Sequence, residues 1–327
     1  MKTKFFSETD LAVAAQFLRS GKLVAFPTET VYGLGADAMN PAAVAKIFKA
    51  KGRPSDNPLI VHVADPNQVL AVALEVPLVA RNLMAQFWPG PLTLVLPKRS
   101  EVPYQVTAGL ETVAIRFPNH PIALELIRLA GVPLAAPSAN LSGRPSATSW
   151  QAVAEDLDGR IAGIVCGGPT MVGLESTVVD ATCDPPRVLR PGGVSFERLR
   201  DVCLSIEPYR RNAADSPPAI GNSPGLRHKH YQPRARVIVV TAATRDSEFA
   251  NSMMGPTVAH FIGLQLPPNP ARFKSTLICS STTEYAAKLF DFFRKADLDA
   301  AEVVFCESVE DVGIGAALLD RLQRASR

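Results

Sequence analysis

Residues suited to binding phosphates and carboxylates occur in a loop near the N-terminus. The segment PTETVYGLG, residues 27–35, follows a short apolar run and carries the hydroxyls of Thr28 and Thr30 beside the carboxylate of Glu29. Its Gly33–Gly35 stretch predicts a flexible loop. Ligands of α/β sheets bind at the carboxyl ends of strands, so this position predicts a binding site. Taken alone, the segment also fits a simple polar turn.

A second polar segment, KGRPSDNPL, spans residues 51–59. Its prolines favour extended backbone, and a repeat of two would place Lys51, Arg53, Ser55 and Asn57 on one side. Arginine offers a planar fork to phosphate oxygens, and lysine a compact charge. The alternative is a solvated basic loop.

A third segment, AAPSANLSGRPSATS, spans residues 135–149 and is rich in hydroxyls. Small side chains such as Ser138 and Ser146, together with backbone N–H groups, can surround a phosphate without bulk. Arg116 and Arg190 lie at the ends of predicted strands, where they can add positive charge. A flexible turn is the alternative for this segment.

Several motifs of other enzyme classes are absent. The chain has no GxxxxGK[ST], GxSxG or HExxH sequence, which excludes the standard P-loop, serine hydrolase and metalloprotease signatures. GIGAALLD, residues 313–320, resembles half of a dinucleotide-binding turn but lacks the third glycine. His228 and His230 have no third ligand, so no protein-bound metal is predicted.

Composition indicates an ordinary globular protein. The 327 residues are 47% hydrophobic and 20% charged, with a net charge of +3, and this length suits two domains. The five cysteines form no CxxC pair, which favours reduced thiols. No signal peptide or long apolar run occurs, so we predict a soluble cytoplasmic protein with no membrane partner.

Hydrophobic periodicity predicts interleaved strands and helices. Several strands follow one another without a helix, which favours an α/β fold with a twisted mixed sheet. The predicted strands are Leu23–Phe26, Leu59–Val63, Thr93–Leu96, Thr112–Phe117, Leu134–Ala136, Gly163–Val165, Ser176–Asp180, Arg187–Leu189, Val237–Thr241, Thr276–Cys279 and Val303–Phe305. The predicted helices are one from Ser7 to Gly21, Ala42–Lys49, Leu78–Phe87, Ile122–Leu129, Phe196–Val202, Thr283–Lys295 and Ile314–Arg324.

Composition also predicts the domain boundaries. Residues 208–236 contain five prolines, two glycines and six Lys or Arg against the single acid Asp215, as is typical of a linker. We therefore predict a catalytic domain at 1–207 and a smaller α/β domain at 237–327.

The order of the motifs identifies a family. PTETVYGLG is followed by the K-x-R-x-S-x-N pattern, FWPGPLT, VAIRFP, APSANLSG and SPGLRHKHYQP. Together these segments resemble the YrdC-like threonylcarbamoyl-AMP synthase family in its long form, which has a YrdC-like domain, a linker and a C-terminal Rossmann-like domain. The resemblance is dense from Leu11 to about Val202 and looser in the C-terminal domain.

The resemblance implies a nucleotidyltransferase. Such an enzyme converts L-threonine, bicarbonate and ATP, with Mg²⁺, into threonylcarbamoyl-AMP and pyrophosphate. The product serves a separate tRNA threonylcarbamoyl transferase complex, which modifies position 37 of tRNAs that read ANN codons.

The family also implies site residues. Lys51 and Arg53 are expected to act in catalysis by offsetting charge on the triphosphate. If Arg53 and Tyr231 both contact ATP, the linker must fold back as a lid. The implied threonine contacts are Thr30, His62, Arg116, Ser176 and the main chain near Ala136, and the implied ATP contacts are Arg53, Asn57, Thr112, Ser138, Ser146, Arg190 and Tyr231.

Two other functions remain open from the sequence. The linker's basic arm, Arg227, Lys229, Arg234 and Arg236, also fits a weak contact with tRNA or a partner protein. The low net charge and the lack of an aromatic and basic stripe argue against RNA binding as the main task. Carbamoyl-adenylate chemistry in hydrogenase maturation would require further domains and cysteine motifs that this chain lacks.

Overall fold

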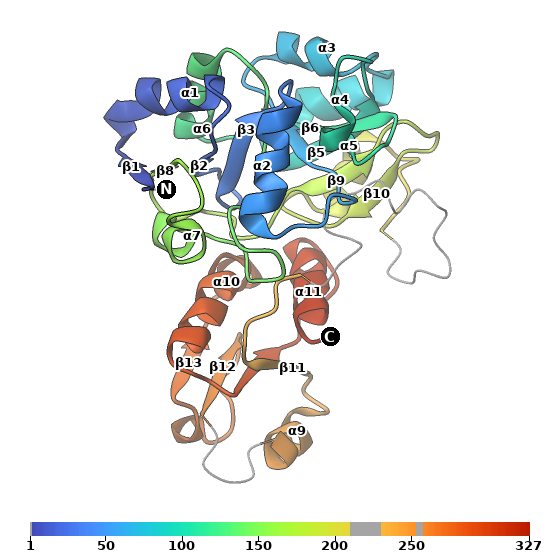
Figure 1. Ribbon diagram of the computed structural model, residues 1–327. Coiled ribbons are helices and arrows are strands. Elements are labelled where there is room, and N and C mark those ends of the chain that lie inside the picture. The colour runs from blue at the N-terminus through green and yellow to red at the C-terminus, as the bar shows by residue number, and fades with distance from the viewer. Residues whose placement is uncertain (1, 210–229, 253–257) are drawn as a thin grey trace.

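The computed structural model describes residues 2–209, 230–252 and 258–327. These residues form two parts, each built on its own sheet (Figure 1). The strands are β1 (Lys4–Phe6), β2 (Val24–Phe26), β3 (Gly33–Asp37), β4 (Ile60–His62), β5 (Leu92–Pro97), β6 (Thr112–Arg116), β7 (Leu134–Ala135), β8 (Gly163–Val165), β9 (Thr177–Asp180), β10 (Arg187–Arg190), β11 (Arg236–Val240), β12 (Ala259–Gly263), β13 (Ser275–Ile278) and β14 (Val303–Glu307). The α-helices are α1 (Leu11–Arg19), α2 (Pro41–Lys51), α3 (Val69–Val72), α4 (Leu78–Phe87), α5 (Tyr104–Thr107), α6 (Pro121–Ala130), α7 (Trp150–Leu157), α8 (Phe196–Val202), α9 (Arg245–Ser252), α10 (Thr282–Leu298) and α11 (Ile314–Ala325), and short 3₁₀ turns are η1 (Glu8–Asp10), η2 (Pro66–Gln68) and η5 (Pro270–Arg272).

The larger sheet has the strand order β1-β8-β2-β3-β7-β4-β6-β5-β9-β10. It is mixed: β4 pairs in parallel with β6 and β5 with β9, whereas β2–β3, β3–β7, β4–β7, β5–β6 and β9–β10 are antiparallel. The prediction of a mixed α/β sheet is confirmed.

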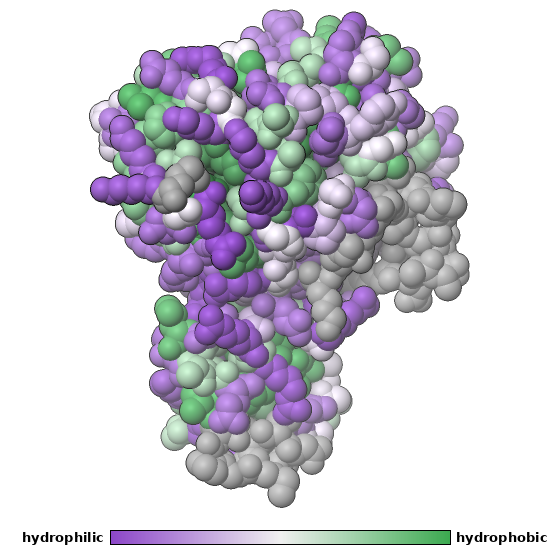
Figure 2. Space-filling model, in the orientation of Figure 1, coloured by the Kyte–Doolittle hydropathy of each residue, from purple (hydrophilic) through white to green (hydrophobic). Residues whose placement is uncertain are grey.

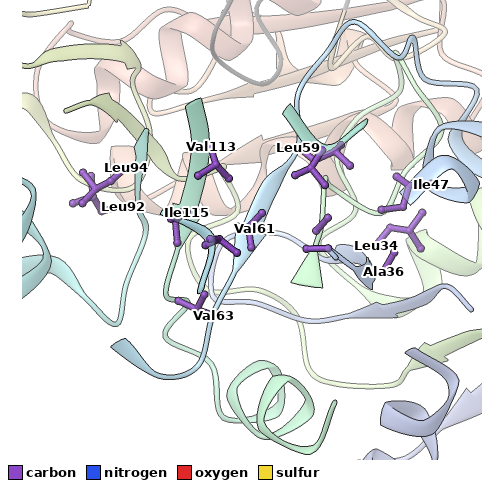
Figure 3. Packing of buried hydrophobic residues seen from close by; sticks show 14 of the residues in the cluster. Leu34, Ala36, Ile47, Leu59, Val61, Val63, Leu92, Leu94, Val113 and Ile115 are labelled. Carbon is purple, nitrogen blue, oxygen red and sulfur yellow. The ribbon is translucent and has the colours of Figure 1, made fainter. Parts of the chain in front are cut away.

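Alternating strand residues divide the core of the larger part into two layers. In β2, Val24 and Phe26 join one cluster with α1 and α6, whereas Ala25 joins the other. The larger cluster takes every second residue of β3, β4, β5 and β6, together with Ile47 of α2 (Figure 3). Period-two strand geometry therefore buries both faces of the sheet.

Helix α2 has clear start and stop signals, and it sets the position of the second polar segment. The Asn40 side chain accepts a hydrogen bond from the Ala43 N–H at 3.1 Å, and Pro41 occupies the first helical position. Gly52 ends the helix with a left-handed φ of 61°, a conformation that glycine adopts without strain. The chain leaving α2 is thus directed toward the sheet edge.

The smaller part is a parallel sheet in the order β11-β14-β12-β13. Helices α10 and α11 pack on one face, and Phe249 of α9 packs on the other. Figure 1 shows that α10 and α11 lie between this sheet and the larger part. This arrangement agrees with the predicted Rossmann-like α/β unit.

The two parts meet through buried polar and apolar contacts. Arg294 of α10 donates to both carboxylate oxygens of Asp156 at 3.3 and 3.0 Å and to the Pro145 carbonyl at 2.7 Å. Val31 and Leu174 of the larger part join the apolar cluster of α10 and α11. Hydrophilic residues gather at this junction on the face shown in Figure 2.

Two sequence interpretations of the polar segments were wrong. Gly33–Gly35 is not a flexible loop, because these residues begin β3, which pairs with β2 as Phe26↔Gly33. KGRPSDNPL is not an extended stretch with four side chains on one side. Lys51 is the last residue of α2 and is buried, and Ser55 in the following turn is exposed.

Several elements were not predicted from the sequence: β1, β3, β12, α3, α5, α7 and α9. In the residues that the structure describes, no helix combines the length and apolar character that a membrane span needs.

Candidate active site

A cavity lies where the loops of the first, second and third polar segments converge with the linker. It encloses about 660 Å³ of space, including the solvent at its open mouth. Among the residues that the structure describes, four arginines and one carboxylate line it, which favours anionic ligands. The polar lining residues in the described part of the chain are Thr28, Thr30, Tyr32, Arg53, His62, Arg116, Ser138, Asn140, Arg144, Ser146, Glu175, Ser176, Arg190, His230 and Tyr231.

One end of the cavity is built by β4 and β6. Parallel pairing sets His62 opposite Arg116 at the ends of these strands. The Arg116 guanidinium donates to the Thr30 hydroxyl at 2.8 Å and to the Gly90 carbonyl at 3.3 Å. The sheet register thus fixes three of the predicted threonine contacts in one place.

The outer nitrogen of Arg116 is available to an anion. Arg116 Nη2 lies 2.7 Å from Glu29 Oε2, but the two atoms are not in hydrogen-bonding geometry. Among the described residues, this buried nitrogen therefore pairs with the Glu29 carboxylate but makes no hydrogen bond. Both side chains are only 4% exposed, so the pair creates a strong local electric field. A carboxylate ligand would supply the missing acceptor.

His62 is a neutral member of this end. It is 3% exposed, and burial together with the positive charge of Arg116 lowers the pKa of His62 to about 3. Its Nδ1 lies 3.3 Å from the Ile60 carbonyl. At neutral pH the ring therefore offers hydrogen bonding and shape without adding charge.

Ser176 connects the two ends of the cavity. Its hydroxyl lies 2.7 Å from the Thr93 hydroxyl, and its carbonyl accepts from Arg190 Nη2 at 2.8 Å and Nε at 3.2 Å. Gly192 makes this packing possible, because a Cβ there would lie 2.3 Å from the Ser176 carbonyl carbon.

Arg53 lies at the second end, just beyond α2. Its Nη2 donates to the carbonyls of Asn57 at 3.4 Å and Pro58 at 3.1 Å, which holds the guanidinium toward the cavity. Burial lowers the pKa of Arg53 to about 10, so it stays charged at neutral pH. Its buried Nε has no acceptor among the residues described here.

Lys51 supports the third segment from beneath. Its ammonium donates to the Ser138 carbonyl at 2.5 Å and to the Asn140 carbonyl, and the side chain does not line the cavity. Burial, and then the charge of Arg53, lower its pKa well below the usual value. The geometry gives Lys51 a role in placing this loop.

The linker returns to the cavity at His230 and Tyr231. The Gln232 N–H donates to the Gly143 carbonyl at 2.9 Å, and Tyr231 is 5% exposed with a φ of 69°. The His230 and Tyr231 rings lie 5.5 Å apart. Burial, then Arg53, lower the pKa of His230 to about 3, so both residues add uncharged rings.

The structure brings most predicted site residues together, with clear exceptions. Thr112 begins β6 and Arg116 ends it, which separates the two by roughly 13 Å at strand rise. Thr112 therefore does not line the cavity, and neither do Lys51 and Asn57, which are buried beside it. Of the linker residues, His228, Arg227 and Lys229 lie outside the described residues.

Sequence reasoning missed three lining residues. Glu175 directly precedes the predicted Ser176, and its acidity among four arginines was the available signal. His230 was interpreted as incidental, although it adjoins Tyr231. Arg144 lies within the third segment, where only the hydroxyls drew attention.

Comparisons with known proteins identify the family. One family model, described as "Telomere recombination", matches residues 16–192, and a second, described as "Threonylcarbamoyl-AMP synthase, C-terminal domain", matches residues 194–327. The threonylcarbamoyl-AMP synthase of Pyrococcus abyssi is 45% identical over 98% of this chain and 94% of its own length. The Bacillus subtilis enzyme of that name is 44% identical over 100% of this chain and 98% of its own. The chain belongs to the threonylcarbamoyl-AMP synthase family.

Structural similarity agrees with this membership. The crystal structure of P. abyssi Sua5 complexed with L-threonine aligns with a TM-score of 0.91 at 42% identity, covering 100% of this chain and 98% of that one. The resemblance drawn from the motifs is thereby confirmed, as is the prediction of a nucleotidyltransferase. A shorter family member from Vibrio campbellii is 33% identical over 54% of this chain and 95% of its own length.

No metal centre is formed by the described side chains, since they contain no cluster of three or more His, Cys, Asp or Glu placed to hold an ion.

Proposed function

We propose that this enzyme condenses L-threonine, bicarbonate and ATP into threonylcarbamoyl-AMP and pyrophosphate. One observation carries the proposal: a single cavity joins Arg116, whose buried outer nitrogen pairs with Glu29 but makes no hydrogen bond, to Arg53, whose buried Nε has no acceptor among the described residues. The first donor suits an amino acid carboxylate and the second a phosphate.

The β4–β6 end is proposed to hold threonine. Arg116 Nη2 would bind the carboxylate, while Thr30, which already accepts from Arg116, keeps the guanidinium plane in position. The neutral ring of His62 and the hydroxyl of Ser176 are available for the amine and hydroxyl of the substrate, and Ala136 adds an apolar wall. The carboxylate replaces water at a site where low exposure strengthens its electrostatic attraction.

The other end is proposed to hold ATP. Arg53 and Arg190 supply positive charge, Ser138 and Ser146 supply small hydroxyls, and Tyr231 covers the site from the linker. Thr112 is omitted, because its strand places it away from the cavity. Asn57 contributes its carbonyl to Arg53, so its proposed role is to orient that arginine.

The chemistry proceeds in two proposed steps. The threonine amine attacks the carbon of bicarbonate, forms the N–C bond of a carbamate and releases water. A carbamate oxygen then attacks the α-phosphorus of ATP, and the bond to the leaving pyrophosphate breaks. Mg²⁺ bound to ATP would neutralise charge on the phosphate oxygens.

The chain's own contribution is position and charge. Holding the reactants in line can supply roughly 7–11 kcal/mol of the barrier. The arginines stabilise the charge that shifts to pyrophosphate. Lys51, by holding the Ser138 and Asn140 carbonyls, keeps the hydroxyl loop in position. No side chain needs to form a covalent intermediate.

The product is a mixed anhydride and must be passed on before water destroys it. We propose that it serves a tRNA threonylcarbamoyl transferase complex that modifies position 37 of tRNAs reading ANN codons.

The test measures pyrophosphate release. Purified protein with ATP, Mg²⁺ and bicarbonate should release pyrophosphate only when L-threonine is present. Threonine-independent release, or none, would contradict the assigned reaction. Arg53→Met should raise the KM for ATP, whereas Arg81→Met is the matched control, because Arg81 is exposed on α4 and bonds only to the nearby Val76 carbonyl in the described structure.

A further inference from the structure

An arginine of the C-terminal domain lies against the nucleotide end of the cavity. Arg321 of α11 is 0% exposed, which is rare for an arginine. Its Nε donates to Glu175 Oε2 at 2.8 Å, its Nη1 to Asp320 Oδ2 at 2.6 Å and its Nη2 to the Pro191 carbonyl at 3.1 Å. All three faces of the guanidinium fork are therefore used, and two of them cross between the domains.

Glu175 connects Arg321 to the cavity. While one carboxylate oxygen accepts from Arg321, the other accepts from the Ser146 hydroxyl at 2.6 Å. Both Glu175 and Ser146 line the cavity. The order of contacts is therefore Arg321, Glu175, Ser146 and then the nucleotide proposed above.

The same arginine helps to seat Tyr231. The Arg321 guanidinium carbon lies 5.2 Å from the centre of the Tyr231 ring, within cation–π distance. Phe290 of α10 stacks on this ring at 5.4 Å and 23°. Tyr231 has a left-handed φ of 69°, which for a non-glycine residue is unfavourable and persists where surrounding contacts hold it. Two C-terminal side chains supply those contacts.

We propose that Arg321 is a positioning residue of the nucleotide site, through which the C-terminal domain fixes Glu175 and Tyr231 for ATP binding. The inference rests on the proposed function for the identity of the nucleotide. It goes beyond that function by giving the C-terminal domain a part in the active site.

Electrostatics supports a positioning role. Burial alone would raise the pKa of Glu175, but the charges of Arg321 and then Arg190, with the hydrogen bond from Ser146, hold this pKa below its usual value. The carboxylate therefore stays ionised and accepts from Ser146. The charge of Glu175 also acts on Tyr231 and His230, so the groups that face this carboxylate are Arg321, Arg190, Ser146, Tyr231 and His230.

Another buried arginine offers a comparison. Arg294 also comes from the C-terminal domain, is 4% exposed and crosses to Asp156 and the Pro145 carbonyl. It contacts neither Glu175 nor Tyr231 in the described structure. Arg294 reaches the cavity wall only indirectly, through the Pro145 carbonyl and through Asp156, which also pairs with Arg144. A simple docking role would make the two arginines equivalent, whereas a positioning role makes Arg321 matter more to ATP.

The experiment measures the ATP dissociation constant by calorimetry and the KM values for ATP and threonine. For Arg321→Met we expect ATP binding to weaken roughly 10- to 100-fold, as for loss of a hydrogen bond to a charged group. The threonine KM should stay near that of the unchanged protein. Arg321→Lys, which keeps the charge without the planar fork, should lie between, and Arg294→Met should weaken ATP binding clearly less than Arg321→Met.

A pH profile separates positioning from general loosening. In Arg321→Met, Glu175 loses its main partner, so its pKa rises and kcat/KM for ATP should fall at a higher pH than normal on the acid side. Adding Glu175→Gln should remove that shift, because the amide oxygen still accepts from Ser146 without a charge to titrate.

Clear outcomes would overturn the inference. Unchanged ATP binding in Arg321→Met, or an equal loss in Arg294→Met, would show that Arg321 only docks the domains. If the unchanged protein releases no threonine-dependent pyrophosphate while Arg321→Met still weakens ATP binding, then the proposed reaction fails and the positioning role stands.

Discussion

The pair of Arg116 and Glu29 permits a test that separates folding from substrate binding. Arg116→Met removes the proposed carboxylate donor and leaves Glu29, which is 3% exposed, without its 2.7 Å partner. The double substitution Glu29→Gln with Arg116→Met removes both charges. The single variant Arg116→Met and the double variant should therefore differ in stability, but both should bind threonine equally weakly.

The magnitudes follow from burial. Removing one partner of a buried ion pair typically lowers the free energy of unfolding by about 3–5 kcal/mol, whereas replacing both charged groups by uncharged ones often changes it little. Arg116→Met should therefore be strongly destabilised, and adding Glu29→Gln should recover at least half of that loss. Losing a hydrogen bond to the charged substrate carboxylate, about 1.5–3 kcal/mol, should raise the threonine KM about 10- to 150-fold in both variants.

Urea unfolding measures the stability, and pyrophosphate release at varied threonine measures the KM. The KM for ATP serves as the internal control, because Arg116 lies at the threonine end. If the double variant recovers both stability and threonine KM, then Arg116 is only the counter-ion of Glu29, and the assignment of the carboxylate site is wrong.

Three further predictions address single positions. His62 has a pKa of about 3 in the folded protein against an ordinary 6.5, so between these pH values the folded state binds fewer protons than the unfolded state. The free energy of unfolding should therefore rise with pH by up to about 1.4 kcal/mol per pH unit in this range. His62→Gln should flatten this slope, as measured by urea unfolding at pH 4 to 7. Gly192→Ala should lower the melting temperature and the activity, because its Cβ would meet the Ser176 carbonyl carbon at 2.3 Å, while Gly168→Ala, with nothing within 4 Å, should behave normally in the same melts. Lys51→Met should lower kcat and loosen the two carbonyls that its ammonium holds, seen as faster amide exchange in that loop; unchanged exchange would contradict the positioning role.

Much of the larger domain could be predicted from sequence because local signals agree with tertiary packing there. Strands such as β5 and β6 are mostly apolar, and α2 has both an Asn40 cap and Gly52 at its end. The segment at Gly33–Gly35 failed because glycine disfavours strands locally. At this strand, close packing on Phe26 requires glycine, because a Cβ on Gly35 would lie 2.8 Å from that ring.

The sequence predicted part of the residues that line the candidate site. The order of the motifs predicted that Arg53, Arg116 and Tyr231 belong to the site, because the type of each side chain and its place in a motif indicate what it can bind. Period-two reasoning failed between Lys51 and Asn57, because the helix continues to Lys51 and a turn follows. Arg321 could not be found this way, because a charge on an amphipathic helix is ordinarily a solvated residue.

The contacts of the C-terminal domain can be compared with a family member that is shorter than this chain. A family member that matches 54% of this chain over 95% of its own length carries the same enzyme name, and it is too short to match both the larger domain and the helices α10 and α11. In this chain, however, Glu175 and Tyr231 take partners from those helices. A domain added beside a complete site can tighten substrate binding, and it can do so only through residues that reach the cavity wall. This reasoning predicts that Arg321 affects the affinity for ATP more than the turnover number, the reverse of what loss of a reacting group would give.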